Sequence, residues 1–273
     1  LIPLEEGAPR RLAESLDRHV VLLPPPAITP GPAWSADSQS VTCIIADAGN
    51  LRVVRAPLDA SEAQRIVTGE RQVTSASLPV VCPAGNRRAS GSADATRIAF
   101  IATQPDNTND VFVCDGNGGE ERRLTRVNEA LLAQLQLPRV ERRKFQSPHG
   151  YELDGWLMHP LAGQPPAPLL VDIHGGPASY AGNLFILGYF YRYVLAARGW
   201  AVLMLNPTGS GSYSKEFTHG IRARWGEHDL PEQLAAVDAL VREGIADENR
   251  LAVAGYSYGG FMTSWTIGHT QRF

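Results

Sequence analysis

The feature that most restricts the fold of this chain is a serine among glycines near its C-terminal end, in Gly255-Tyr256-Ser257-Tyr258-Gly259-Gly260. An apolar run, 250–254, precedes the motif, and residues 261–265 can continue it as a helix. A G-x-S-x-G motif between a buried strand and a helix is typical of a strained turn that pushes the serine hydroxyl outward. Small residues are needed on both sides because side chains there would strike the neighbouring strand and helix. The sequence therefore predicts Ser257 as a nucleophile.

A second glycine pair supports this interpretation. His174-Gly175-Gly176-Pro177 follows the apolar run 169–173, and Gly176 lies 81 residues before Ser257. In α/β-hydrolases a loop at this place gives one N–H to the oxyanion, and the residue after the nucleophile, here Tyr258, gives the other. We therefore predict Tyr258, Gly175 and Gly176 as oxyanion residues and His174 as a residue that shapes the loop. An ordinary tight turn is the alternative.

The second half of the chain alternates strand and helix signals. Strands are expected over 151–159, 169–173, 200–205 and 250–254, and helices over 189–198 and 231–241. This order predicts a mostly parallel sheet with helices on both faces, beginning near residue 146.

The first half, 1–145, is instead a series of short strands separated by polar turns. Ser35-Ala36-Asp37 and Ser92-Ala93-Asp94 each lead into a strand that contains isoleucine, and the two aspartates lie 57 residues apart. A strand-rich repeat of this length is typical of one blade of a β-propeller. We expect the C-terminal blades of a propeller here, and a β-sandwich stays open as the alternative.

Composition excludes several partners. The 25 basic and 28 acidic residues nearly balance, and the basic clusters are scattered, so neither nucleic acid nor a membrane surface is expected. No apolar stretch approaches the ~20 residues of a membrane-spanning helix, and the N-terminus does not resemble a secretory signal. Cys43, Cys82 and Cys114 lack pairing or metal-ligand spacing, which favours free thiols and a cytoplasmic location. No metal and no cofactor are predicted.

Four blocks of the second half resemble the prolyl oligopeptidase family of serine peptidases. They are His174–Pro177, Asn206–Tyr213, Trp225-Gly226-x-x-Asp229 and Gly255–Thr263. The His-Gly-Gly-Pro form is closer to its acylaminoacyl-peptidase and dipeptidyl-peptidase-like branch. The resemblance implies an α/β-hydrolase domain preceded by a β-propeller, and cleavage of short peptides admitted to a cavity between the two.

Within these blocks, one position departs from the family pattern. Relatives usually carry Arg where this chain has Thr208, so Asn206 and Thr208 are not assigned to substrate contact. Trp225 and Asp229 are expected to be structural, because aromatic side chains usually pack.

The catalytic partners of Ser257 are not evident. On this fold the orienting carboxylate and the histidine base follow the serine in the chain. Only 16 residues follow Ser257, they contain no carboxylate, and His269 is expected on the surface. Residues 1–145 also hold at most two or three blades. We therefore expect a segment of a longer protein, with an incomplete hydrolase domain over 146–273 and a partial propeller over 1–145, and no activity of the segment alone.

Three functions remain open at this point. The leading one is a serine-type peptidase that hydrolyses short peptides through an acyl-enzyme on Ser257. The second is a small-ester hydrolase on the same fold, and the third is a non-catalytic remnant or interaction module. Besides the peptide substrate, a second copy of the chain or a complementary fragment of the same protein stays open as a partner.

Overall fold

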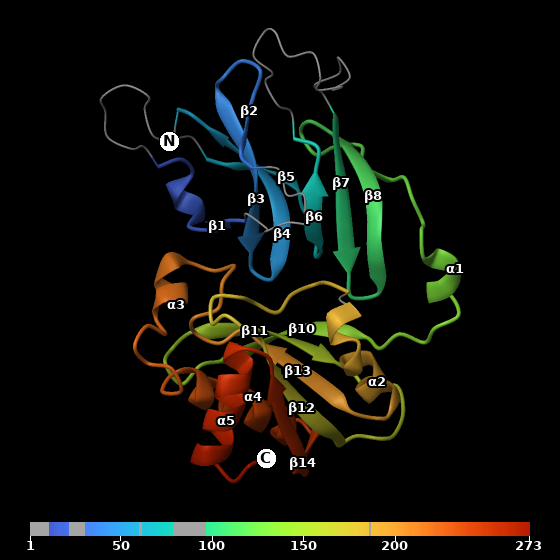
Figure 1. Ribbon diagram of the computed structural model, residues 1–273, viewed down its shortest axis with the longest axis vertical. Coiled ribbons are helices and arrows are strands. Elements are labelled where there is room, and N and C mark those ends of the chain that lie inside the picture. The colour runs from blue at the N-terminus through green and yellow to red at the C-terminus, as the bar shows by residue number, and fades with distance from the viewer. Residues whose placement is uncertain (1–10, 22–30, 60–61, 79–96, 186) are drawn as a thin grey trace. The chain divides into compact units, whose positions relative to one another are not determined.

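The computed structural model describes residues 11–21, 31–59, 62–78, 97–185 and 187–273 and divides the chain into two compact units (Figure 1). Unit 1 comprises Leu1–Gln104 with Asn109–Val127, and unit 2 comprises Pro105–Thr108 with Asn128–Phe273. The main division therefore falls near residue 127, earlier than the expected boundary at 145/146. The physical reason is that the strand at Val140–Gln146 pairs along its whole length with the next strand, which belongs to unit 2.

Unit 1 contains a nine-stranded sheet in the order β1-β3-β4-β6-β7-β8-β9, with β2 paired to β3 and β5 paired to β4. A single 3-10 turn, η1 (Glu14–Leu16), precedes it. The strands are β1 (His19–Val20), β2 (Ala33–Trp34), β3 (Ser40–Asp47), β4 (Asn50–Pro57), β5 (Gln64–Val67), β6 (Gln72–Ala76), β7 (Arg97–Gln104), β8 (Asn107–Asp115) and β9 (Arg122–Arg123).

The strands of this sheet fall into two similar groups. Strands β2 to β5 pair successively and antiparallel, β6 to β9 also pair successively, and the groups meet at one parallel pair, Leu51 with Gln72. Strand β3 begins at Ser40 and β7 at Arg97, which reproduces the 57-residue period. In the first Ser-Ala-Asp turn, Asp37 accepts the N–H of Gln39 at 3.0 Å. The turn of the second copy lies outside the described residues.

Unit 2 contains a five-stranded sheet in the order β10-β11-β13-β12-β14. Its strands are β10 (Val140–Gln146), β11 (Glu152–Met158), β12 (Ala167–Ile173), β13 (Ala201–Leu205) and β14 (Ala246–Gly255). Strand β12 runs parallel to β13 and β14, whereas β10 and β11 form an antiparallel hairpin and β11 pairs antiparallel with β13. The sheet is therefore mixed, not mostly parallel, because the hairpin occupies one side of it.

Helices cover both faces of this sheet, as predicted. They are α1 (Glu129–Leu132), α2 (Tyr191–Ala197), α3 (Lys215–His219), α4 (Asp229–Arg242) and α5 (Tyr258–His269), with a 3-10 turn η2 (Leu187–Tyr189). Val237 of α4 and Met262 of α5 pack in one core with Val171, whereas Ala196 of α2 packs in another with Val202. Successive strand residues point to opposite faces, so one sheet supplies both cores. In Figure 1 these helices surround the sheet in yellow to red colours.

Candidate active site

Ser257 lies in the turn between β14 and α5, in the strand–turn–helix context that the sequence predicts. Strand β14 ends at Gly255 and α5 begins at Tyr258. The backbone of Ser257 has φ 58° and ψ −118°, a region that residues other than glycine rarely adopt. Ser257 and Tyr256 are both exposed, Tyr256 to 75%. The turn therefore presents the serine hydroxyl at the surface of unit 2.

Glycine is required on both sides of this turn. A Cβ on Gly259 would lie 2.0 Å from the carbonyl oxygen of Ile173, and one on Gly255 would lie 2.5 Å from the carbonyl carbon of Gly259. Both atoms belong to the backbone and cannot rotate away. The missing side chains therefore allow α5 to begin directly against the end of β12.

The structure brings the predicted oxyanion loop to the serine. A Cβ on Gly175 would lie 3.4 Å from the Cβ of Ser257 and 3.2 Å from the carbonyl oxygen of Tyr256. Gly176 has φ 122°, and a Cβ there would lie 2.4 Å from the amide nitrogen of Ser179. The Gly176–Pro177 peptide is cis. Gly175 is thus the loop residue next to the serine, while Gly176 gives the loop its turn.

His174 uses both ring nitrogens to hold this loop. Its Nδ1 lies 2.7 Å from the carbonyl oxygen of Gly175, and its Nε2 lies 3.0 Å from the hydroxyl of Ser210. Burial lowers the pKa of His174 and favours the neutral ring. Because a carbonyl only accepts, Nδ1 carries the proton and Nε2 accepts from Ser210. This arrangement matches the expected role in shaping the loop.

The segment that contains Asn206 and Thr208 is buried. Asn206 bonds the backbone of Ala181 with both amide atoms, at 2.7 and 2.9 Å. Thr208 donates to the carboxylate of Glu232 from its N–H at 2.7 Å and its hydroxyl at 2.8 Å, and Ser147 donates a third bond at 2.6 Å. Glu232 is 0% exposed. Three neutral donors therefore surround this carboxylate at the place where relatives usually carry Arg.

A contact that sequence reasoning did not anticipate joins Asp229 to the residue after the serine. The hydroxyl of Tyr258 donates to one oxygen of Asp229, and the other oxygen accepts the N–H of Gly226 at 2.7 Å. The ring of Trp225 lies 5.0 Å from that of Tyr258, edge to face. The Trp225-Gly226-x-x-Asp229 block was therefore the available signal, but its partner could not be identified from spacing.

The remaining histidines near this region have structural partners. His269 is exposed, donates from Nδ1 to the carbonyl of Trp265 at 2.7 Å and stacks on the Trp265 ring, as expected for a surface residue. His149 stacks on His228 with ring centroids 4.2 Å apart. Among the described residues, no group of three or more His, Cys, Asp or Glu side chains could hold a metal ion.

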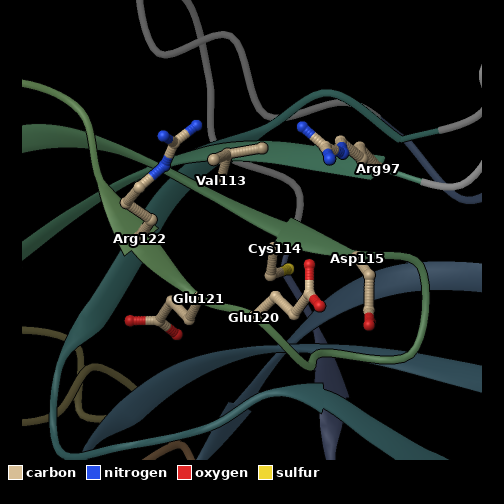
Figure 2. A pocket seen from close by; sticks show the side chains of 7 residues that line it. All are labelled: Arg97, Val113, Cys114, Asp115, Glu120, Glu121 and Arg122. Carbon is tan, nitrogen blue, oxygen red and sulfur yellow. The ribbon is translucent and has the colours of Figure 1, made fainter.

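A polar hollow of about 570 Å³ in unit 1 was weighed as a second candidate site (Figure 2). Its nucleophile would be Cys114, but burial and the neighbouring carboxylates of Glu121 and Asp115 raise the pKa of this thiol. A protonated thiol is a poor nucleophile. Glu121 is also engaged, since Arg71 binds it with two hydrogen bonds of 2.7 and 2.5 Å. This hollow therefore lacks a reactive group, whereas the Ser257 turn has one.

Comparison with known proteins identifies the family. Residues 189–273 match the model of the prolyl oligopeptidase family. The chain belongs to the prolyl oligopeptidase family. Over its whole length it is 32% identical to the uncharacterized peptidase YuxL of Bacillus subtilis, across 282 aligned residues that make up 40% of that protein. It is also 27% identical to dipeptidyl-peptidase 5 of Porphyromonas endodontalis over 165 residues, which cover 60% of this chain and 24% of that protein.

A solved structure supports the fold of this family member. Acylaminoacyl peptidase of Pyrococcus horikoshii superposes with a TM-score of 0.77 at 24% identity, covering 96% of this chain and 37% of that one. The chain thus has the α/β-hydrolase fold, and its relatives are of the branch that the His-Gly-Gly-Pro form indicated. It spans 40% or less of the length of these relatives. In the described part of the chain, no helix is long and apolar enough to cross a membrane.

Proposed function

We propose that the protein containing this chain is a serine peptidase that hydrolyses short peptides through an acyl-enzyme on Ser257. The observation that carries the proposal is the exposed serine at a positive-φ turn, with Gly175 of a second loop directly against it. Membership of a peptidase family supports the reaction class. Free, buried Cys43 and Cys114 favour a reducing, cytoplasmic location.

The proposed reaction follows from this geometry. The hydroxyl oxygen of Ser257 attacks the carbonyl carbon of the scissile bond, and its proton passes to a general base. The N–H of Tyr258 and an N–H of the Gly175–Gly176 loop stabilise the oxyanion, helped by the positive end of α5. Collapse expels the amine, which takes up the proton, and water then releases the acyl group from the serine.

The base and its orienting carboxylate belong to the same proposal. On the α/β-hydrolase fold these two residues follow the nucleophile in the chain. We therefore assign them to sequence of the full-length protein beyond Phe273, and we expect the 273-residue chain alone to be inactive.

Unit 1 suggests how substrates are limited to short peptides. Its two four-stranded groups with a 57-residue period are what consecutive blades of a propeller require. We infer that these strands belong to a β-propeller in the full-length protein, and that the propeller excludes folded substrates.

A fluorophosphonate probe tests the proposal on the full-length protein. Labelling is expected on Ser257, and Ser257→Ala is expected to abolish both labelling and peptide turnover, a fall of about 10⁴-fold or more. Ser264→Ala is the matched control, because Ser264 is an exposed serine one helix-length away on α5 and should leave turnover unchanged. Full turnover in the Ser257→Ala protein would refute the proposal.

A further inference from the structure

The side chain of Tyr258 points away from the substrate side of the turn. Tyr258 is only 7% exposed, whereas its neighbours Tyr256 and Ser257 are exposed. It is also the first residue of α5, and the first N–H groups of a helix have no acceptor within the helix. The N–H of Tyr258 is therefore free to meet an oxyanion, and the side chain determines how that N–H is aimed.

Asp229 holds this side chain at its far end. The Tyr258 hydroxyl donates to the Asp229 carboxylate, which is 1% exposed. Burial raises the pKa of Asp229, while the hydrogen bonds from Tyr258 and Gly226 act in the opposite direction. A buried carboxylate costs free energy unless donors satisfy it, so these two bonds fix each other in place.

Aromatic packing fixes the ring between its two ends. Trp225 meets the Tyr258 ring edge to face at 5.0 Å, and Phe261, one turn along α5, lies 5.8 Å from it. Gly226 has φ 87°, and a Cβ there would lie 2.3 Å from the Trp265 ring. The turn 225–229 is thus packed tightly against the first two turns of α5.

We propose that Asp229 is a positioning residue for catalysis, because it holds Tyr258 so that the Tyr258 N–H points to the oxyanion. This inference rests on the proposed function and adds a residue that does not touch the substrate. The effect passes from the carboxylate through the phenol ring to the backbone of the residue that follows Ser257. It acts on the transition state, in which the oxyanion exists, and not on the bound peptide.

The test compares Tyr258→Phe, Asp229→Asn and the double variant in the full-length protein. Phenylalanine keeps the ring and its packing, and asparagine keeps the shape of Asp229, so both variants should fold. Asp238→Asn is the matched control, because Asp238 lies on the same helix but its side chain is 52% exposed and pairs with Arg272. The readouts are kcat, KM, the melting temperature, and the affinity for a peptidyl trifluoromethyl ketone, which forms an oxyanion on the serine.

We expect kcat to fall about tenfold in each single variant, the size of one lost hydrogen bond to a charged group. KM should stay within about twofold, since ground-state binding is untouched. The affinity for the ketone should fall in parallel with kcat, and the double variant should be no worse than either single variant, because both break one contact.

Other results separate this inference from the proposed function. If Ser257→Ala abolishes turnover but both single variants keep wild-type kcat and ketone affinity, the positioning role is wrong and the peptidase proposal stands. A lower melting temperature without loss of ketone affinity, or effects that add in the double variant, also overturns it. If Ser257→Ala retains turnover, both proposals fall together.

Discussion

At the scale of single residues, the Ser257 turn depends on atoms that are absent. Its φ of 58° is tolerated because the residues two positions away on either side are Gly255 and Gly259, which let strand, turn and helix approach closely. Backbone strain of this kind persists only where the surroundings determine it fully. The cost of a single added methyl group at these positions is therefore a direct measure of how tightly the elbow is built.

Two glycines of α5 provide a matched pair for this measurement. Gly259→Ala would place its Cβ 2.0 Å from the carbonyl oxygen of Ile173, so we expect a loss of about 2 kcal/mol or more in the free energy of unfolding. Gly268→Ala meets nothing within 4 Å and should gain about 0.5 kcal/mol, because alanine favours the helix. Urea denaturation of both variants measures the difference. Equal effects at the two positions would show that the contact with β12 is not as close as described.

At the scale of elements, the β10–β11 hairpin is held by one buried carboxylate. Asp154 on β11 accepts two hydrogen bonds of 2.9 Å from Arg142 on β10 and one of 2.9 Å from Tyr213. Lys144 adds an ion pair at 3.1 Å. Burial alone would raise the pKa of Asp154, but these donors outweigh it and the pKa lies below the ordinary value. The folded protein therefore favours the charged carboxylate.

This direction determines how stability depends on pH. A carboxyl group whose pKa is depressed by folding stabilises the protein above its unfolded pKa, and this contribution is lost as pH falls through the folded pKa. Asp154→Asn should therefore lower the free energy of unfolding by about 3 kcal/mol at pH 7. The gap to the wild type should narrow as pH falls below about 4. Urea denaturation across this range checks it, with Asp238→Asn as the exposed control, and a gap that stays constant to low pH would contradict it.

The sequence predicted elements better than their partners. The apolar period of 231–241 predicted the helix found at Asp229–Arg242, since periodicity is a local property. Which sheet a strand joins is not local, so β10 was expected at a boundary and instead pairs with β11. The same holds for the site. The elbow and its loop have recognisable motifs, whereas the bond from Tyr258 to Asp229 joins residues 29 positions apart and exists only after α4 and α5 have packed.

At the scale of the whole chain, each unit has a core of its own. Ile44 in β3 is buried within unit 1 at 1% exposure, and Leu203 in β13 is buried within unit 2 at 0%. Compact units that bury separate cores can unfold in separate transitions, in which case a single free energy of unfolding does not describe the chain. The place where a core substitution acts then shows which transition belongs to which unit.

The matched substitutions Ile44→Ala and Leu203→Ala test this in scanning calorimetry of the chain. Each removes a buried aliphatic side chain and should cost about 3 kcal/mol through lost burial and the cavity left behind. We expect two transitions, one lowered only by Ile44→Ala and the other only by Leu203→Ala, because the two residues contribute to different cores. If either substitution lowers both transitions equally, the units fold as one cooperative body. Strands that repeat like propeller blades and the sheet that carries Ser257 would then depend on each other for stability.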